Sequence, residues 1–381
     1  MFLEQLKKEF LKIFTDKAVI ITVIGGVLFY AVLYPQPYLN QLPLQQSIAV
    51  VDHDNTPTSR RLIRYANATP QVHVAQHVGS ISEARSLLLD GKVRGMLVIP
   101  RHFQKDLGLS RSPVIGLAGD ANFFLVYGTV IEGLAGAVMS TGATARVREL
   151  MLAGIPLSFA VKDWSPIHLN ERPLFNVGMG YLGYVIPAIF ILILQQTLLL
   201  ASALIGAESN EKSGLEFRRA GSVFGARFVA MFVVYFLLTQ FYMGACFSYY
   251  GISRNAGIFD LWMMIAAFIS ASTALGILIG LLLPRRELAA PMVMLSSLPM
   301  AFTAGFIWPR ELLPYPVLWI SEWFPSTPAI QGFLKLNQMG AEFSQVLNHW
   351  WSLWVLAGFF SVLSLILLTR KARPVQITEA V

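Results

Sequence analysis

The sequence is poor in charged residues. Only 13% of its 381 residues are Asp, Glu, Lys or Arg, and 55% are hydrophobic, whereas a soluble domain has about 25% charged residues. Several apolar stretches are long enough to cross a bilayer core, which takes roughly 20 helical residues. The shortage of charge and the length of these stretches together indicate an integral membrane protein.

Two further absences narrow the function. Cys246 is the single cysteine, so no disulfide can form within the chain and cysteine usage does not indicate a redox compartment. The sequence contains no G-x-x-x-x-G-K-[ST] pattern, so the chain cannot hold ATP phosphates in the P-loop manner. Any use of ATP would therefore act through another polypeptide.

The apolar stretches predict an α-helical integral membrane protein with six transmembrane helices. A small α/β extracytoplasmic domain is inserted between helices 1 and 2. The predicted spans are residues 18–34, 177–205, 228–250, 262–283, 288–308 and 350–369. None of them has an Asp, Glu, Lys, Arg or His in its interior, which argues against proton-coupled transport and intramembrane catalysis.

The first 17 residues precede these spans and have their own pattern. Phe2, Leu6, Phe10 and Ile13 recur at helical spacing, with lysines elsewhere on the wheel. This pattern predicts an amphipathic helix in the headgroup plane, with a solvated helix as the alternative. The span 18–34 then reads as an uncleaved anchor, because no A-x-A-like cleavage site follows it.

Residues 35–176 have ordinary polar composition and predict alternating strands and helices. Thr56 before Pro57 is a typical helix start, and Ser80 with Glu83 fits a capping box. The predicted strands are 48–51, 72–75, 95–99 and 114–118, and the predicted helices include 84–89, 100–107 and 122–153. Asp52, His53, Asp54 and Asp120 would be candidate metal ligands, but acids at strand ends more often shape turns, so no metal site is predicted.

Basic residues predict the orientation. One set of span ends carries Lys7, Lys8, Lys12, Lys17, Lys212, Arg218, Arg219, Arg227, Arg285, Arg286, Arg370, Lys371 and Arg373; the opposite short connections carry Arg254, Arg310 and Lys335. The positive-inside rule then places both termini and residues 206–227 in the cytoplasm, and residues 35–176 outside. With basic residues gathered beside spans in this way, no nucleic-acid partner is expected. The tryptophans fall on the predicted outer side, as an aromatic belt would.

The predicted cytoplasmic loop 206–227 mixes charges of both signs. Its marked residues are Glu208, Glu211, Gly214, Glu216, Arg218 and Arg219. One interpretation is a short helix along the membrane that docks into a groove of a soluble partner, with charge complementarity fixing its register. The other is a solvated loop whose cations only set topology. The sequence leaves both open.

The outer connection 308–331 is broken by prolines into pieces too short to span. It predicts re-entrant or interfacial helices that close the outer mouth of a pathway. The alternative is a tryptophan-rich interfacial loop without a gating role. The candidate gate residues are Gly305, Pro309, Glu311, Pro314, Pro325 and Pro328.

Few polar side chains lie within the predicted spans. Gln195, Gln196 and Gln240 are candidate pathway-lining residues, although such amides more often bond a neighbouring helix, and that interpretation is favoured. The pattern Gly276-x-x-x-Gly280 permits close helix packing.

These features together resemble a known family. An interfacial helix, one span, a large outer domain and five further spans resemble the permease subunit of ABC-2 type ABC transporters, in the subgroup with large outer domains. Glu211-x-x-Gly214-x-Glu216 resembles that family's E-x-G-T-x-E coupling loop at one residue wider spacing. Its upstream R-E-R-E run is here Ala207-Glu208-Ser209-Asn210.

Two more regions carry the resemblance. The segment from Gly305 through Pro309-Arg310-Glu311 and Pro314 to Pro325-Ser326-Thr327-Pro328 resembles the family's outer segment before the last span. The outer-domain motifs are Val50-Val51-Asp52-His53-Asp54, Ser59-Arg60, Ile99-Pro100-Arg101-His102-Phe103 and Gly119-Asp120-Ala121-Asn122. The resemblance covers nearly the whole chain.

The resemblance implies a transport subunit rather than an enzyme. It implies a multi-pass exporter in the bacterial inner membrane. The absence of charges from the spans, rather than the resemblance, predicts an apolar or amphipathic substrate, drug-like or lipid-like, because an uncharged path handles such molecules at the lowest cost. A permease of this family works as a dimer with an identical or paralogous copy, together with cytoplasmic ATPase subunits and often a periplasmic adaptor. No cofactor is expected on this chain; ATP and magnesium would bind the ATPase.

Two other functions stay compatible with the sequence. The first is a membrane-anchored sensor or scaffold whose outer domain binds a ligand, although five further spans exceed what an anchor needs. The second is a membrane enzyme such as a lipid transferase, which would need convergent acids or histidines that the sequence does not present.

Overall fold

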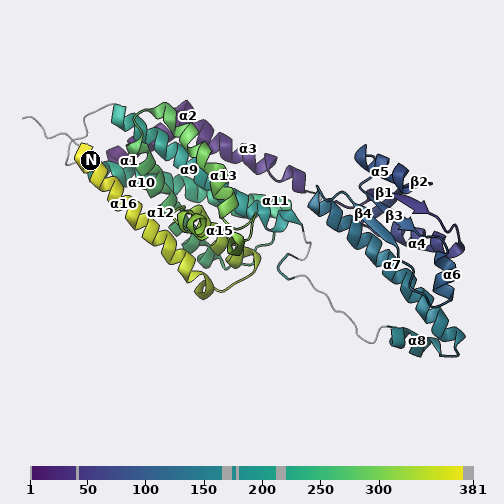
Figure 1. The fold of residues 1–381 in the computed structure, drawn as a ribbon. Helices are drawn as coiled ribbons and strands as arrows, with labels where there is room; N and C mark the ends of the chain where they lie inside the picture. Colours follow the sequence, from purple (N-terminus) through teal and green to yellow (C-terminus); the bar gives the residue numbers. More distant parts are fainter. Residues whose placement is uncertain (1, 40–42, 165–173, 177–179, 212–219, 372–381) are drawn as a thin grey trace, which may run out of the picture. The chain divides into compact units, whose positions relative to one another are not determined.

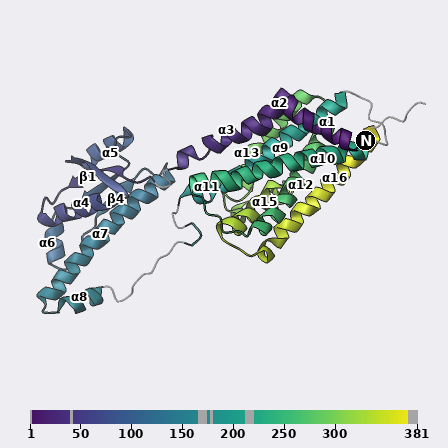
Figure 2. The same ribbon diagram turned by 180° about the vertical axis from the view of Figure 1, so that it is seen from behind.

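The protein divides into two compact units. The computed structural model describes residues 2–39, 43–164, 174–176, 180–211 and 220–371. Unit 1 comprises residues 1–41 and 173–381, and unit 2 comprises residues 42–172. Unit 1 is helical and unit 2 contains the sheet (Figures 1 and 2).

Unit 2 is built on a four-stranded sheet. Its strands are β1 (Gln46–Asp52), β2 (Val72–Val78), β3 (Gly95–Ile99) and β4 (Gly116–Gly119). Their order is β2-β1-β3-β4; β1 is parallel to β2 and β3, and β4 is antiparallel to β3. The four predicted strands are confirmed, but β1 and β2 are both longer than expected, and β4 begins and ends later than predicted. No pattern in the sequence indicated the order of the strands in the sheet.

Helices cover both faces of this sheet, because successive side chains of a strand point to opposite faces. Ile48 and Val50 share a core with α4 (Pro57–Ala68), α6 (Phe103–Gly108) and α7 (Phe124–Leu152). Ala49 and Val51 pack with α5 (Ile81–Leu89) on the other face. A short helix, α8 (Leu157–Trp164), follows α7.

The helix starts predicted in unit 2 are confirmed at Thr56 and Ser80. Thr56 forms a reciprocal capping box with Ser59. Ser80 caps α5 by accepting from the Glu83 N–H. The Glu83 carboxylate, however, accepts from the N–H of Gly79 rather than from Ser80. Both caps are local signals, which is why the sequence locates them.

Unit 1 is a bundle of helices. Its N-terminal segment is α1 (Phe2–Thr15), α2 (Lys17–Ile20), the π-helix Ile21–Gly26 and α3 (Val27–Leu33). The later helices are α9 (Val185–Glu211), α10 (Ala220–Gln240), the π-helix Phe241–Cys246, α11 (Phe247–Tyr250), α12 (Ile258–Leu282), α13 (Ala289–Thr303), α14 (Tyr315–Ser321), α15 (Ser326–Phe333) and α16 (Leu347–Lys371). Of these, α9 and α12 are the most deeply buried.

Glycines let α9 and α12 approach closely. A Cβ added to Gly280 would lie 2.9 Å from the Cα of Gly206, and one added to Gly276 would lie 2.7 Å from the Cβ of Ser202. Real Cβ atoms essentially never come so near. The close packing predicted from Gly276-x-x-x-Gly280 is therefore confirmed.

Six helices in the described residues are long and apolar enough to cross a membrane. Five match predicted spans: 17–38, 185–208, 221–250, 258–282 and 343–371. The sixth is residues 124–152, which is α7. Its residues Val130, Leu134 and Ala137 are buried against the sheet of unit 2, so its apolar character serves that core.

The predicted span 288–308 is corrected in its helical extent. Its helix α13 has 15 residues, a length of about 22 Å at 1.5 Å per residue, so residues beyond α13 would have to complete a crossing of a bilayer core of about 30 Å. The helix ends because Gly305 adopts a left-handed φ of 87°.

The predicted loop 206–227 is also shorter than expected. Helix α9 continues to Glu211 and α10 begins at Ala220. The residues between them lie outside the described part of the chain.

Candidate functional site

Helix α1, the beginning of α10 and the end of α16 lie at the same end of unit 1 (Figure 1). Helix α1 packs along α10. Of the predicted apolar face, Ile13 is buried in the unit 1 core, Leu6 and Phe10 are partly buried against it, and Phe2 is exposed. The helix is confirmed, whereas its placement in the headgroup plane stays a prediction. We call this region the α1 end.

A buried ion pair joins the two helices. Arg227 of α10 donates from Nε to Glu9 Oε2 at 3.1 Å and from Nη2 to Glu9 Oε1 at 3.5 Å. The side chains are 2% and 1% exposed, respectively. Gln5 Nε2 also donates to Glu9 Oε1 at 3.1 Å, and Lys12 Nζ lies 3.6 Å from that oxygen.

This environment sets the charge state of Glu9. Burial alone would raise the pKa of Glu9, but the neighbouring Arg227 and Lys12 charges and the hydrogen bonds from Arg227 and Gln5 hold the pKa below its ordinary value of 4.5. Glu9 is therefore ionised at neutral pH and attracts Arg227 as a full anion.

A second ion pair reaches the turn between α12 and α13. Asp16 caps α2 by accepting from the N–H groups of Ala18 and Val19. Its Oδ2 also accepts from Arg286 Nη2 at 2.5 Å. Arg286 begins the 3-10 turn Arg286–Leu288, which precedes α13. The N-terminal segment is thus tied to α10 on one side and to the start of α13 on the other.

The residues of the predicted loop are only partly described. Glu208 lies half-buried on α9, and Glu211 is the last residue of that helix. Gly214, Glu216, Arg218 and Arg219 lie outside the described residues. The docking and topology interpretations of this loop therefore both stay predictions.

The predicted pathway glutamines separate into two places. Gln195 Nε2 lies 3.2 Å from Ser326 Oγ and 3.3 Å from Met300 Sδ, and Gln196 Nε2 lies 3.0 Å from the same sulfur. We call these four residues the glutamine cluster. Gln240 instead accepts from the indole N–H of Trp262.

The glutamine cluster has unused acceptors. Within the described chain, Gln195 Oε1 and Gln196 Oε1 are buried without a hydrogen-bond partner. An unsatisfied buried acceptor costs about 1–3 kcal/mol. The amide N–H groups bond neighbouring helices, as favoured from the sequence, but the carbonyl oxygens are left over.

The outer connection forms the short helices that its prolines predict. Pro309 precedes the 3-10 turn Arg310–Leu312, Pro314 precedes α14, and Pro325 precedes α15. Pro328 is buried within α15. These prolines therefore stand at helix starts or in first turns, where the missing N–H costs little.

Two contacts hold this connection in place. Gln331 of α15 donates to the carbonyl of Ala304 at 2.7 Å, and Arg310 pairs with Glu322. A Cβ on Gly305 would lie 2.5 Å from Arg310 Cγ and 2.6 Å from Gln331 Nε2. Glu311, which was marked in the sequence, is exposed; the acid that pairs here is Glu322.

The strand-end acids of unit 2 shape a turn. Asp52 accepts from the N–H groups of Asp54 and Asn55 and from the Ser59 hydroxyl. Asp54 accepts from the Thr56 hydroxyl and the Gln104 N–H. Among the described residues, no three His, Cys, Asp or Glu side chains gather as ligands for a metal ion.

No functional role was predicted individually for Glu9, Asp16, Met300, Ser326 or Glu322. Only Glu9 had a signal that could have found it. It follows Leu6 by three residues and precedes Ile13 by four, so it shares their face of the helix. A carboxylate on an apolar face needs a buried cation.

Comparison with known proteins identifies this architecture over almost its whole length. Residues 17–366 match the family model described as "ABC-2 family transporter protein". A search of curated proteins finds no match.

Proposed function

The chain belongs to the ABC-2 family of transporter proteins, and on that premise we propose that it is the permease subunit of an ATP-driven exporter. It is a multi-pass membrane protein and a transport permease. The proposal adds that it moves an apolar or amphipathic molecule out of the cytoplasm or the inner membrane. ATP and magnesium would bind a separate cytoplasmic ATPase subunit.

The observation that carries this proposal is the pair of ion pairs at the α1 end. Residues 206–227 are the proposed ATPase contact, and Arg227 is their last residue. A force on this segment reaches α1 through Glu9, because the buried pair is held by two donor contacts. It reaches the start of α13 through Asp16 and Arg286.

The glutamine cluster supports the substrate class. It joins α9, α13 and α15, so a movement of α13 changes its geometry. Its side chains are neutral, and a neutral path handles uncharged apolar surface at a lower desolvation cost than a charged one would. We place the cluster on the substrate path, and α15 with its Gln331 contact at the proposed outer gate.

The proposed transporter is a complex of several subunits with a defined orientation in the membrane. Two permease chains, identical or paralogous, would pair with two ATPase subunits in the bacterial inner membrane. Both termini would be cytoplasmic, and unit 2 would lie outside, where a periplasmic adaptor can reach it. The distribution of basic residues supports this orientation.

Co-purification and reconstitution test the proposal. Tagged protein is expected to bring down a nucleotide-hydrolysing subunit, and the complex in vesicles is expected to move an amphipathic fluorescent dye only with ATP. The double variant Glu9→Leu/Arg227→Leu, which leaves no unpaired buried charge, should keep ATP hydrolysis but lower dye movement, because the charged link between α10 and α1 is removed. Lys8→Gln, an exposed change on the same helix, is the matched control.

Three results would contradict it. A chain that never co-purifies with a nucleotide-hydrolysing subunit is not such a permease. Dye movement that is independent of ATP would point instead to another transport mechanism. Tight ligand binding without transport would favour the membrane-anchored sensor.

A further inference from the structure

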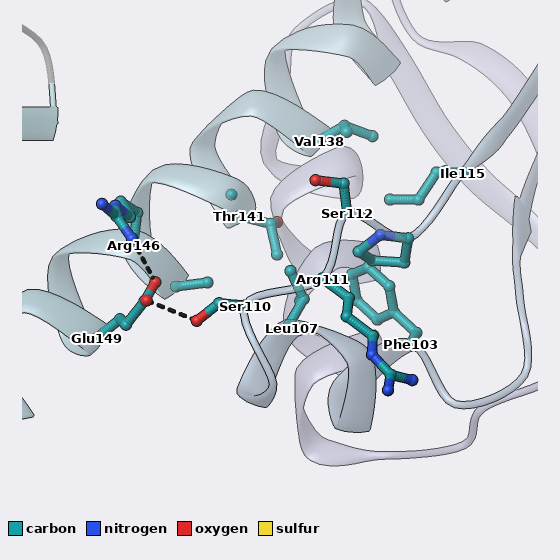
Figure 3. A pocket seen from close by; sticks show the side chains of 13 residues that line it. Phe103, Leu107, Ser110, Arg111, Ser112, Ile115, Val138, Thr141, Arg146 and Glu149 are labelled. Atoms are coloured by element: carbon teal, nitrogen blue, oxygen red, sulfur yellow. Dashed lines mark hydrogen bonds and ion pairs between the residues drawn. The ribbon is translucent and has the colours of Figure 1, made fainter.

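Unit 2 contains a cavity of about 360 Å³ between α6, residues 109–115 and the C-terminal half of α7 (Figure 3). This volume falls in the range of about 300–1,000 Å³ that is typical of small-molecule sites. The cavity is formed by unit 2 alone and shares no residue with the α1 end or the glutamine cluster.

The cavity exists because α7 continues beyond the sheet with small residues. Ala137 is the last α7 residue fully buried in the core shared with the sheet. On the continuing helix, Gly142 and Ala145 face the cavity. A Cβ added to Gly142 would meet no atom within 4 Å, so a larger side chain there would occupy the empty space.

One side of the cavity is apolar. Phe103, Leu107, Ile115 and Val138 line it, and Phe103 is almost fully buried. The cavity is open to solvent, so the exposed parts of these apolar side chains face water. An apolar group that entered the cavity would remove that surface from water, which stabilises binding.

The other side is a prearranged polar group, which Figure 3 shows joined by dashed lines. The Ser110 hydroxyl donates to Glu149 Oε1 at 2.6 Å, and Arg146 Nη1 donates to Glu149 Oε2 at 2.9 Å. Each oxygen of the carboxylate thus already accepts one hydrogen bond. The guanidinium of Arg146 has five N–H donors, so the hydrogen bonds that Ser110, Glu149 and Arg146 can still offer a ligand come mainly from donors.

The charged residues that line the cavity are consistent with this donor character. Two lining residues are cations, Arg111 and Arg146, and one is an anion, Glu149. Arg146 is paired with Glu149, and Arg111 lies 3.6 Å from Asp106, so each of these charges already has a partner. The N–H donors that the guanidinium groups keep nevertheless favour a ligand with an acceptor or anionic end over a cation.

We propose that this cavity binds a small amphipathic anion, meaning a short apolar body that ends in a carboxylate or a comparable acceptor group. The body lies against Phe103, Leu107 and Val138. The head group accepts from Arg146 beside the Ser110–Glu149 contact. This makes unit 2 a ligand-binding domain in addition to any structural role.

The test uses sodium octanoate as the probe and the full-length protein in lipid nanodiscs. Isothermal titration, with empty nanodiscs subtracted, is expected to show one saturable octanoate site per chain. Octanol and octylamine have an apolar body one carbon longer than that of octanoate and lack the anionic head. We expect both to bind at least about tenfold more weakly, the difference that one charge-assisted hydrogen bond supplies.

Two glycine variants of α7 provide a matched pair. Gly142→Leu fills the cavity, and leucine favours a helix more than glycine does, so loss of octanoate binding would not reflect unfolding of α7. Gly136→Leu is the control, because a Cβ there also meets nothing within 4 Å but Gly136 does not line the cavity. Octanoate binding is expected to be lost in the first variant and kept in the second.

A third variant tests the head group. Arg146→Gln should weaken octanoate about tenfold and leave octanol unchanged. The proposal is overturned if no saturable octanoate binding occurs, if the two glycine variants behave alike, or if octylamine binds best. None of these results would affect the permease proposal, which rests on unit 1.

Discussion

At the scale of single residues, the Glu9–Arg227 pair is the most demanding contact at the α1 end. Both side chains are almost fully buried, so each has lost its hydration. Breaking such a pair by removing one partner costs about 3–5 kcal/mol, because the remaining charge stays buried and unpaired. Replacing both partners by apolar residues is often neutral.

Glu9→Gln is therefore expected to destabilise unit 1 by about 3–5 kcal/mol. The measurement is the thermal unfolding of purified protein at neutral pH. The double variant Glu9→Leu/Arg227→Leu leaves no unpaired charge and should recover most of the loss. A double variant as unstable as the single one would show that packing, rather than charge, holds α1.

The pH dependence of stability has a definite sign. The pKa of Glu9 is depressed below 4.5 in the folded protein, so the folded state favours the ionised form more than the unfolded state does. Its contribution is fully present above about pH 4.5 and is lost as the pH falls through the folded-state pKa.

The unfolding temperature of the wild type should therefore fall as the pH is lowered below about 4.5. In Glu9→Gln this component should be missing, so its unfolding temperature should change less over the same pH range. Parallel pH profiles for the two proteins would be inconsistent with an ionised Glu9 in the folded state.

At the scale of elements, the contact between α9 and α12 decides how closely the bundle packs. Gly280 and Gly206 face each other with no room for a Cβ. Membrane helices gain little from the hydrophobic effect against lipid, so close van der Waals packing at small residues stabilises their association. The two helices also carry Ser202 and Gly276 at the same contact.

Gly280→Ala should separate α9 from α12 and cost about 1–3 kcal/mol, as overpacking of a close contact does. Thermal unfolding measures this. Gly244→Ala in the π-helix is the matched control, because a Cβ there meets nothing within 4 Å. If both variants unfold at the same temperature, the glycine contact does not limit the approach of the helices.

At the scale of the whole molecule, the two units differ in composition and in what they bury. Unit 1 buries apolar residues in a helical bundle, whereas unit 2 buries both faces of a sheet. The proposed topology places residues 206–227 and unit 2 on opposite sides of the membrane. In that proposed arrangement, a cytoplasmic ATPase would act on the chain while unit 2 would meet an extracytoplasmic partner.

Cysteine labelling tests this topology. In a Cys246→Ser background, Ser112→Cys in unit 2 should react with an impermeant thiol reagent added from the periplasmic side of the membrane. Ser213→Cys should react only after the membrane is permeabilised. Reaction of both from the same side would refute the topology and the coupling proposal with it.

The local signals of the chain were sufficient for much of the fold. Apolar length predicted the spans that α9, α10, α12 and α16 form, and period-two patterns with capping residues predicted the strands and helix starts of unit 2. These features depend on residues within a few positions of each other, so no distant partner is needed to recognise them.

The sequence alone determined the membrane class, the α/β character of residues 35–176 and that the face of Gly276 and Gly280 permits close packing. Only the tertiary structure decided the partners: Arg227 for Glu9, Ser326 and Met300 for Gln195, and Glu322 for Arg310. It also decided that α13 ends early and that α7 packs on a sheet. A sequence pattern states which face of a helix is apolar, but a contact between residues that are far apart in the chain depends on how whole elements pack, and periodicity carries no record of that.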